Sequence, residues 1–165
     1  MIFDKIQLVE ELINISIEED LKDGDPSSEI IYSNPQAKYN LILKEDAVIS
    51  GIEVFKYIFN KIDKSINFMN FKEDSFYYKG VIGEIIGNES SILSAERTAL
   101  NFIQRMSSVA TATYNLKKLI NNQNVQLIDT RKTIPGWRIL DKYSVLVGGG
   151  KNHRMNLGEL IMIKD

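Results

Sequence analysis

The amino-acid sequence predicts an α+β N-terminal domain followed by parallel strand–helix units, as in an α/β barrel or a doubly wound sheet. Apolar residues near the N-terminus recur at spacings of three and four, which is typical of an amphipathic helix. Alternating apolar stretches with glycine bends follow, and these indicate antiparallel strands. After residue 90 the pattern changes to long helices and short apolar strands. We therefore expect two domains, 1–108 and 109–165.

The first domain reads as helix, strands, helix and strands. Residues 2–22 carry the helical pattern, and Gly24 and Pro26 end it in a turn because both residues break helices. Further along, apolar alternation predicts strands and a return to helical spacing predicts a second helix. The expected elements are one or two strands within 38–50, a helix over 52–62, and strands over 65–71 and 75–87.

The second half has a different order. Two consecutive helices are expected over 91–106 and 107–122, and a short buried strand over 125–129 follows. A polar loop, a helix over 135–147, a glycine turn and an apolar strand over 160–164 complete a βαβ unit. In such folds, polar residues at the carboxyl ends of the strands bind the ligand.

Composition excludes several classes of protein. The chain has 165 residues, 44% of them hydrophobic, and a net charge of −2, so no global basic field attracts nucleic acid or membranes. It has no cysteine and one histidine, which excludes disulfides and a multi-histidine zinc site. The interrupted, charged N-terminus does not read as a signal peptide, and no apolar run approaches the roughly 20 residues that cross a bilayer. A cytoplasmic location is expected.

Charge is unevenly distributed along the chain. Acids crowd residues 18–25, whereas the stretch 131–154 is rich in lysine and arginine and has a single acid, Asp141. A local cationic region in a nearly neutral protein favours a small anionic ligand over a polyanion. Arg131 and Lys132 directly follow the predicted strand, and the pair suits an anion with carboxylate and phosphate oxygens. The alternative is an ordinary solvated loop.

The stretch "GGGKNHR" also suits an anion. Glycines let backbone N–H groups approach a ligand closely, and His153 and Arg154 add side-chain donors. Lys164 would lie at the same rim as Arg131 if the two strands are parallel. Each residue also has a simpler interpretation: an exposed histidine, an ordinary loop, or a terminal lysine. By spacing alone, Arg97 reads as one half of a surface ion pair.

Four stretches in this order resemble the quinolinate phosphoribosyltransferase family: "EEDLKDGD", "ERTALNFIQRMSSVATAT", "DTRKTIPGWRILDKYSV" and "GGGKNHRMNLGELIMIKD". The resemblance implies an α/β sandwich domain followed by an α/β barrel. It also implies transfer of a phosphoribosyl group from phosphoribosyl pyrophosphate to quinolinate, with magnesium. The products are nicotinate mononucleotide, pyrophosphate and carbon dioxide, a step in NAD biosynthesis.

The resemblance also assigns site residues. Thr130, Arg131 and Lys132 would bind substrate, and His153, Arg154 and Lys164 would line the same pocket. Arg97 would act across the interface of a homodimer. No residue is assigned a catalytic role. The family's chains are longer, so we expect the carboxylates that hold magnesium to lie beyond Asp165 and this chain alone to be inactive.

Two alternative functions remain open at this point. One is a related phosphoribosyltransferase-like protein associated with molybdenum transport, and the other is a non-catalytic module for anion binding or dimerisation.

Overall fold

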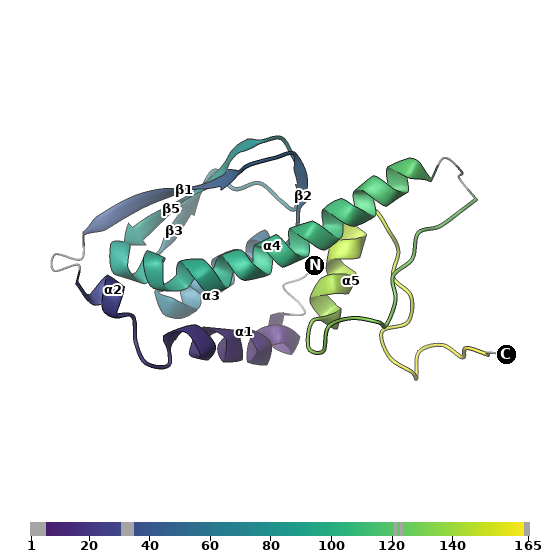
Figure 1. The fold of residues 1–165 in the computed structure, drawn as a ribbon, viewed down its shortest axis with the longest axis horizontal. Helices are drawn as coiled ribbons and strands as arrows, with labels where there is room; N and C mark the ends of the chain where they lie inside the picture. The colour runs from purple at the N-terminus through teal and green to yellow at the C-terminus, as the bar shows by residue number, and fades with distance from the viewer. Residues whose placement is uncertain (1–5, 31–34, 121, 123, 164–165) are drawn as a thin grey trace.

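The computed structural model describes residues 6–30, 35–120, 122 and 124–163 (Figure 1). Helices and strands are interspersed up to residue 119, and one further helix follows. In chain order they are α1 (Ile6–Leu21), α2 (Pro26–Glu29), β1 (Gln36–Leu43), β2 (Ala47–Ile49), α3 (Ile52–Ile62), β3 (Asn67–Met69), β4 (Ser75–Tyr77), β5 (Gly80–Asn88), α4 (Glu89–Leu119) and α5 (Arg138–Val147).

Two small antiparallel sheets form in the first half of the chain. One has the strand order β1-β5-β3, with an irregularity between Leu41 and Ile42, and the other pairs β2 with β4. The predicted antiparallel arrangement is confirmed. The turn predicted after the first helix forms at Lys22 and Asp23. Pro26–Glu29 then form the short helix α2, which Asp25 caps by accepting the backbone N–H of Ser28.

The long helix α4 runs the length of the molecule beneath the sheets (Figure 1). The prediction of two helices in this region is wrong, because the serines at its midpoint find partners without breaking it. The Ser108 hydroxyl donates to the Gln104 carbonyl at 2.8 Å, and the Ser107 hydroxyl accepts the Ser50 N–H at 3.1 Å. The expected domain boundary at residue 108 falls inside this helix, and the division into two domains stays a prediction.

The apolar core lies between the three-stranded sheet and helices α1, α3 and α4. Phe55 and Phe59 of α3 are fully buried, with ring centroids 4.9 Å apart. Trp137, at the start of α5, stacks on Phe102 of α4 at 4.7 Å and so attaches the C-terminal region to this core. Gly148, which ends α5, lies so close to α4 that a Cβ there would be 2.4 Å from the Ala110 carbonyl oxygen.

The two short strands predicted near the C-terminus do not form as strands among the described residues. Residues 125–129 contribute one parallel bridge, in which Ile128 pairs with Lys151. Residues 160–163 have no strand structure, and Ile161 and Ile163 are exposed. A strand requires a neighbouring backbone for its hydrogen bonds, and no described segment lies in register beside 160–163.

Candidate anion-binding site

The single parallel bridge brings the two cationic stretches of the sequence together. Asp129 N donates to the Lys151 carbonyl at 3.0 Å, and Lys151 N donates to the Leu127 carbonyl at 2.9 Å. Because the two segments run in the same direction, the residues after each one leave the bridge on the same side. Loop 130–132 and loop 152–154 are therefore neighbours, although the parallel partner of 125–129 is Lys151 and not the predicted strand 160–164.

A buried carboxylate lies between these two loops. Asp129 accepts hydrogen bonds from the Lys142 ammonium of α5, from the Asn152 side-chain amide and from the His153 backbone N–H, the last at 2.8 Å. The Lys142 ammonium also donates to the His153 carbonyl at 3.1 Å. This network fixes the backbone on both sides of the bridge, directly beside the predicted binding residues.

Loop 130–132 presents the donors that the sequence predicted. Arg131 is half-buried, and its Nε atom is buried without a hydrogen-bond partner in the structure. Thr130 and Lys132 are exposed, and the Lys132 N–H donates to the Thr130 hydroxyl at 3.1 Å. A buried donor without an acceptor is costly, so Arg131 is suited to an incoming anion.

The other predicted residues differ in what surrounds them. His153 is half-buried beside the bridge, whereas the Arg154 guanidinium donates to the Leu160 carbonyl at 2.8 Å and contacts the Met162 sulfur at 3.7 Å. Arg154 therefore holds the chain after it as well as lying near the site. Lys164 lies outside the described residues.

Arg97 is far from this cluster within one chain. It is exposed and lies near the beginning of α4, whereas the segments that carry loops 130–132 and 152–154 lie below the other end of that helix (Figure 1). No ion pair or hydrogen bond joins its side chain to another residue within 6–30, 35–120, 122 or 124–163. Its predicted role across a subunit interface stays a prediction.

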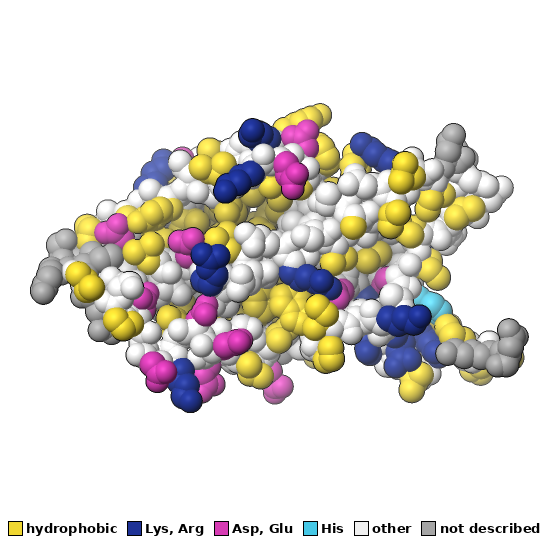
Figure 2. Space-filling view, viewed as in Figure 1, with side chains coloured by type: hydrophobic (Ala, Val, Ile, Leu, Met, Phe, Trp, Pro, Cys, Tyr) yellow, Lys and Arg dark blue, Asp and Glu magenta, His cyan; other side chains and the backbone are white. Residues whose placement is uncertain are grey.

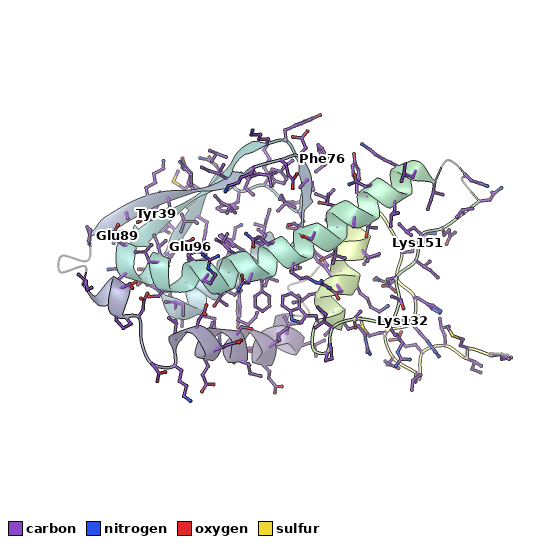
Figure 3. The ribbon with its side chains drawn as sticks, viewed as in Figure 1. Tyr39, Phe76, Glu89, Glu96, Lys132 and Lys151 are labelled. Carbon is purple, nitrogen blue, oxygen red and sulfur yellow. The ribbon has the colours of Figure 1, made fainter. Side chains whose placement is uncertain are left out.

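Positive charge exceeds negative charge within residues 129–163. Of the acids within 129–163, Asp129 pairs with Lys142, Asp141 pairs with Arg105, and Glu159 accepts the Met155 N–H. Figure 2 shows lysine and arginine side chains gathered beside the C-terminal segment. Figure 3 places Lys132 and Lys151 on this segment, and Glu89 and Glu96 at the opposite end of the molecule. The surface near the loops therefore favours an anion.

The residues that organise the loops give little local signal in the sequence. Lys142 and Asp141 lie on a helix with otherwise ordinary spacing, and Asp129 was read as the end of a strand. Both members of the Lys142–Asp129 pair are buried, with side chains 1% and 4% exposed. A signal was present in the order "LDKY", which places two charged residues beside Leu140, a fully buried member of the core.

The part of the chain that the structure describes offers no cluster of three or more acids or histidines for a metal ion. The one carboxylate at the loops, Asp129, is already bound by Lys142, Asn152 and the His153 N–H. These residues do not fit a magnesium site. Within the same ranges, no helix combines the length and the apolar character needed to span a membrane.

The fold and the loops define a class of protein. In this class an α+β domain is followed by a long helix and then by two cationic loops at a parallel bridge. A model described as the quinolinate phosphoribosyl transferase N-terminal domain matches residues 10–107, and one described as the C-terminal domain of that transferase matches residues 109–165. The chain belongs to the quinolinate phosphoribosyltransferase family.

Individual relatives support the same conclusion. The chain is 42% identical over 158 residues to nicotinate-nucleotide pyrophosphorylase (carboxylating), chloroplastic, from Oryza sativa subsp. japonica. The matched region covers 93% of this chain and 42% of that protein. It is 37% identical over 158 residues to quinolinate phosphoribosyltransferase (decarboxylating) 1b from Nicotiana tabacum, covering 93% and 45%.

The fold is also that of a solved relative. The crystal structure of NadC from Streptococcus pyogenes matches with a TM-score of 0.92 and 36% identity, covering 100% of this chain and 58% of that one. The likeness confirms the predicted fold class, an α+β domain followed by the beginning of a barrel-like domain. The chain spans about half the length of the relatives it matches.

Proposed function

We propose that this chain binds quinolinate at loops 130–132 and 152–154 and serves the transfer of a phosphoribosyl group to it from phosphoribosyl pyrophosphate. The observation that carries the proposal is the pairing of two cationic loops whose nearby acids are all engaged. Quinolinate has two adjacent carboxylates and the co-substrate has phosphates, so both need cationic donors. The names of the relatives supply the reaction class.

In the proposed reaction, pyrophosphate leaves the ribose C1 atom as positive charge develops there, and the pyridine nitrogen forms the new C–N bond. The resulting pyridinium stabilises the electron pair left at C2 when carbon dioxide departs. A proton then takes the place of that carboxylate, and the product is nicotinate mononucleotide. Arg131 and Lys132 would bind the carboxylates and hold the ring in place, because orientation and fixed charge supply most of the catalysis in such a step.

We expect magnesium to arrive bound to phosphoribosyl pyrophosphate, and it would neutralise the charge of the pyrophosphate leaving group. No step is assigned to it, because the described residues do not fit a magnesium site. A homodimer is a further part of the proposal, with the exposed Arg97 donating to the substrate of its partner. Sedimentation of wild-type protein and Arg97→Ala, together with their quinolinate affinities, would test it.

A cytoplasmic location belongs to the same proposal. The relatives include a chloroplastic protein, so the family does not fix the compartment. Fractionation of cells that express the chain would test it. Of the alternative functions, the molybdenum-associated protein is disfavoured by the names of the relatives reported above, which refer to nicotinate nucleotide or quinolinate.

Calorimetric titration with quinolinate tests the binding site. Arg131→Gln removes the guanidinium whose Nε lacks a partner, and we expect roughly tenfold weaker binding or more, since a charged hydrogen bond contributes about 1.5–3 kcal/mol. Lys64→Gln makes the same change of charge at an exposed position after α3 and should bind as wild type. Equal affinities for wild type and Arg131→Gln would overturn the assignment.

Product chromatography separates an enzyme from a non-catalytic module. The chain is supplied with quinolinate, phosphoribosyl pyrophosphate and magnesium, by itself and together with the remaining part of the Nicotiana tabacum relative. Nicotinate mononucleotide above a control without protein supports the enzyme. Tight quinolinate binding without product in either mixture supports the module.

A further inference from the structure

A lysine is buried at the centre of the C-terminal region. Lys142 is 1% exposed, although lysine is among the residues least often buried. Its charge is compensated by Asp129, whose side chain is also buried. Two charges removed from water contribute little net stability compared with apolar residues of the same size, so a buried pair of this kind calls for another explanation.

The contacts of Lys142 join the two cationic loops. Its ammonium donates to the Asp129 carboxylate and, at 3.1 Å, to the His153 carbonyl. Asn152 completes a ring of contacts, since its side-chain amide donates to the other Asp129 oxygen and, at 2.8 Å, to the Lys142 carbonyl. Asp129 is followed directly by Thr130 and Arg131, so a shift of this ring would move both loops.

The helix that carries Lys142 is anchored to the rest of the molecule by the residues on either side of it. Asp141 forms a two-pronged ion pair with Arg105 of α4, with contacts of 3.1–3.2 Å. Tyr143 donates its hydroxyl to Asp74 at 2.9 Å, and Asp74 in turn accepts the N–H groups of Gly51 and Ile52 at the start of α3. Consecutive residues of α5 thus attach to α4, to the loops and to α3.

We propose that Lys142 is a positioning residue for quinolinate: through Asp129 and the His153 carbonyl it sets the spacing of the two loops whose cations receive the two carboxylates. The inference rests on the proposed function. The ammonium of Lys142 is buried and donates to two protein oxygens, so it acts on the ligand through the loops. Figure 1 shows α5 beneath α4, with the C-terminal segment beside it.

The main test compares two variants that each break one ion pair of α5. Lys142→Met keeps the length of the side chain and removes its charge, whereas Arg105→Met breaks the neighbouring pair with Asp141, which does not touch the loops. Calorimetry reports the dissociation constant and the fraction of binding-competent protein separately. A structural role lowers that fraction, whereas a positioning role weakens the dissociation constant of the folded molecules.

We expect Lys142→Met to bind quinolinate on the order of tenfold more weakly, because a misplaced site loses its paired contacts. Binding of nicotinate, which has one carboxylate, should change far less, since it needs only one loop. Lys142→Arg should restore part of the quinolinate affinity by keeping the charge. Arg105→Met should keep a dissociation constant close to that of wild type, because Tyr143 still anchors α5 through Asp74 and the ring around Asp129 is intact.

A milder pair of variants keeps the test decisive if Lys142→Met does not fold. Asn152→Ala removes one exposed side chain of the ring. Asn156→Ala removes a similar exposed side chain, whose hydrogen bonds are to Glu159 and Gly158 and lie outside the ring. Asn152→Ala should weaken quinolinate binding about threefold. It should also reduce the hydrogen-exchange protection of the His153 amide, because the bond from this amide to Asp129 is one of several that hold the loops. Asn156→Ala should do neither.

The outcomes separate the two proposals. Wild-type protein that does not bind quinolinate would overturn the proposed function and this inference with it. If the wild type binds quinolinate and Lys142→Met has the same dissociation constant, the positioning role alone would be overturned. If Lys142→Met does not fold, an unchanged dissociation constant in Asn152→Ala would overturn it. Equal losses for quinolinate and nicotinate would also overturn it, because a change in loop spacing acts on the second carboxylate.

Discussion

The body of the molecule, residues 6–119, and its C-terminal region, residues 124–163, are held together by different forces. The body has an apolar core in which Phe55, Phe59 and Phe102 are almost completely buried. The C-terminal region has one buried helix face and a polar ring around Asp129, and its last described residues include the exposed Ile161 and Ile163. Apolar burial dominates in the first region. In the second, hydrogen bonds and the Lys142–Asp129 ion pair act beside a smaller apolar contact through Trp137 and Leu140.

The difference explains where each region is suited to act. Apolar packing is insensitive to direction and makes a stable support, whereas polar contacts fix individual groups at defined places. The cations of the C-terminal region are held by such contacts and remain partly exposed. Substitutions in the body should therefore change the stability of the whole chain, and substitutions in the second region should change binding first.

The largest expected effect comes from opening the core of the body. Phe55→Ala leaves a cavity among Phe59, Phe71 and their neighbours, and we expect the free energy of unfolding to fall by about 3–5 kcal/mol. This is a large part of the total for a domain, about 5–15 kcal/mol. Urea unfolding followed by circular dichroism measures it. Phe76→Ala, at a position that is 38% exposed, is the control and should cost much less. Equal losses would mean that the described core does not stabilise the body.

Local patterns in the sequence were enough to predict most of the body. The spacing of Val9 and Ile13 gives α1, and the glycines in 80–87 punctuate the strand that became β5. The single helix α4 was read as two because a pair of serines resembles a break. Only the fold shows that Ser107 meets the backbone of Ser50, 57 residues earlier in the chain.

The candidate site was predictable in its cations and not in its support. Arg131, Lys132, His153 and Arg154 stand beside a strand pattern or a glycine turn, which are local signals. Lys142 looked like any lysine on a helix, because its burial depends on where α5 packs against α4. The contact between Tyr143 and Asp74 joins residues 69 positions apart in the chain, and local spacing does not predict it.

The junction between the two regions should give an intermediate effect. Gly148→Ala would place a Cβ 2.4 Å from the Ala110 carbonyl oxygen and 2.7 Å from the Thr113 Cβ, so α5 must move away from α4. We expect a loss of about 1–3 kcal/mol in unfolding free energy, as for other overpacked sites.

Gly158→Ala is the matched control for this junction. Its added Cβ would be 3.3 Å from the oxygen of the exposed Asn156 side chain, which need move only slightly, so the loss should be small. Thermal unfolding of the two variants, followed by circular dichroism, compares them. Unchanged stability in Gly148→Ala would show that α5 is not fixed against α4.

The smallest expected effect concerns a polar contact of the body, at the start of α2. The Ser28 hydroxyl, the Ser28 N–H and the Ser94 hydroxyl all donate to Asp25, and the Ser28 hydroxyl is the main reason that the pKa of this carboxyl lies below its usual range. Asp25→Asn keeps a good cap residue and removes the charge, so the variant isolates the effect of ionisation.

The direction of the pH dependence follows from that lowered pKa. Ionised Asp25 stabilises the folded chain at pH values above the pKa of an unfolded aspartate, about 3.9, and the contribution disappears as the pH falls through the lower folded value. The free energy of unfolding of the wild type should therefore exceed that of Asp25→Asn by at most about 0.5 kcal/mol at pH 6. The two free energies should converge in acid. Urea unfolding at several pH values measures this difference. In Ser28→Ala, which lacks the donating hydroxyl, the same comparison should show a smaller difference at pH 6. A gap between wild type and Asp25→Asn that widened on acidification would contradict the assignment, since a lowered pKa loses its stabilising effect only in that direction.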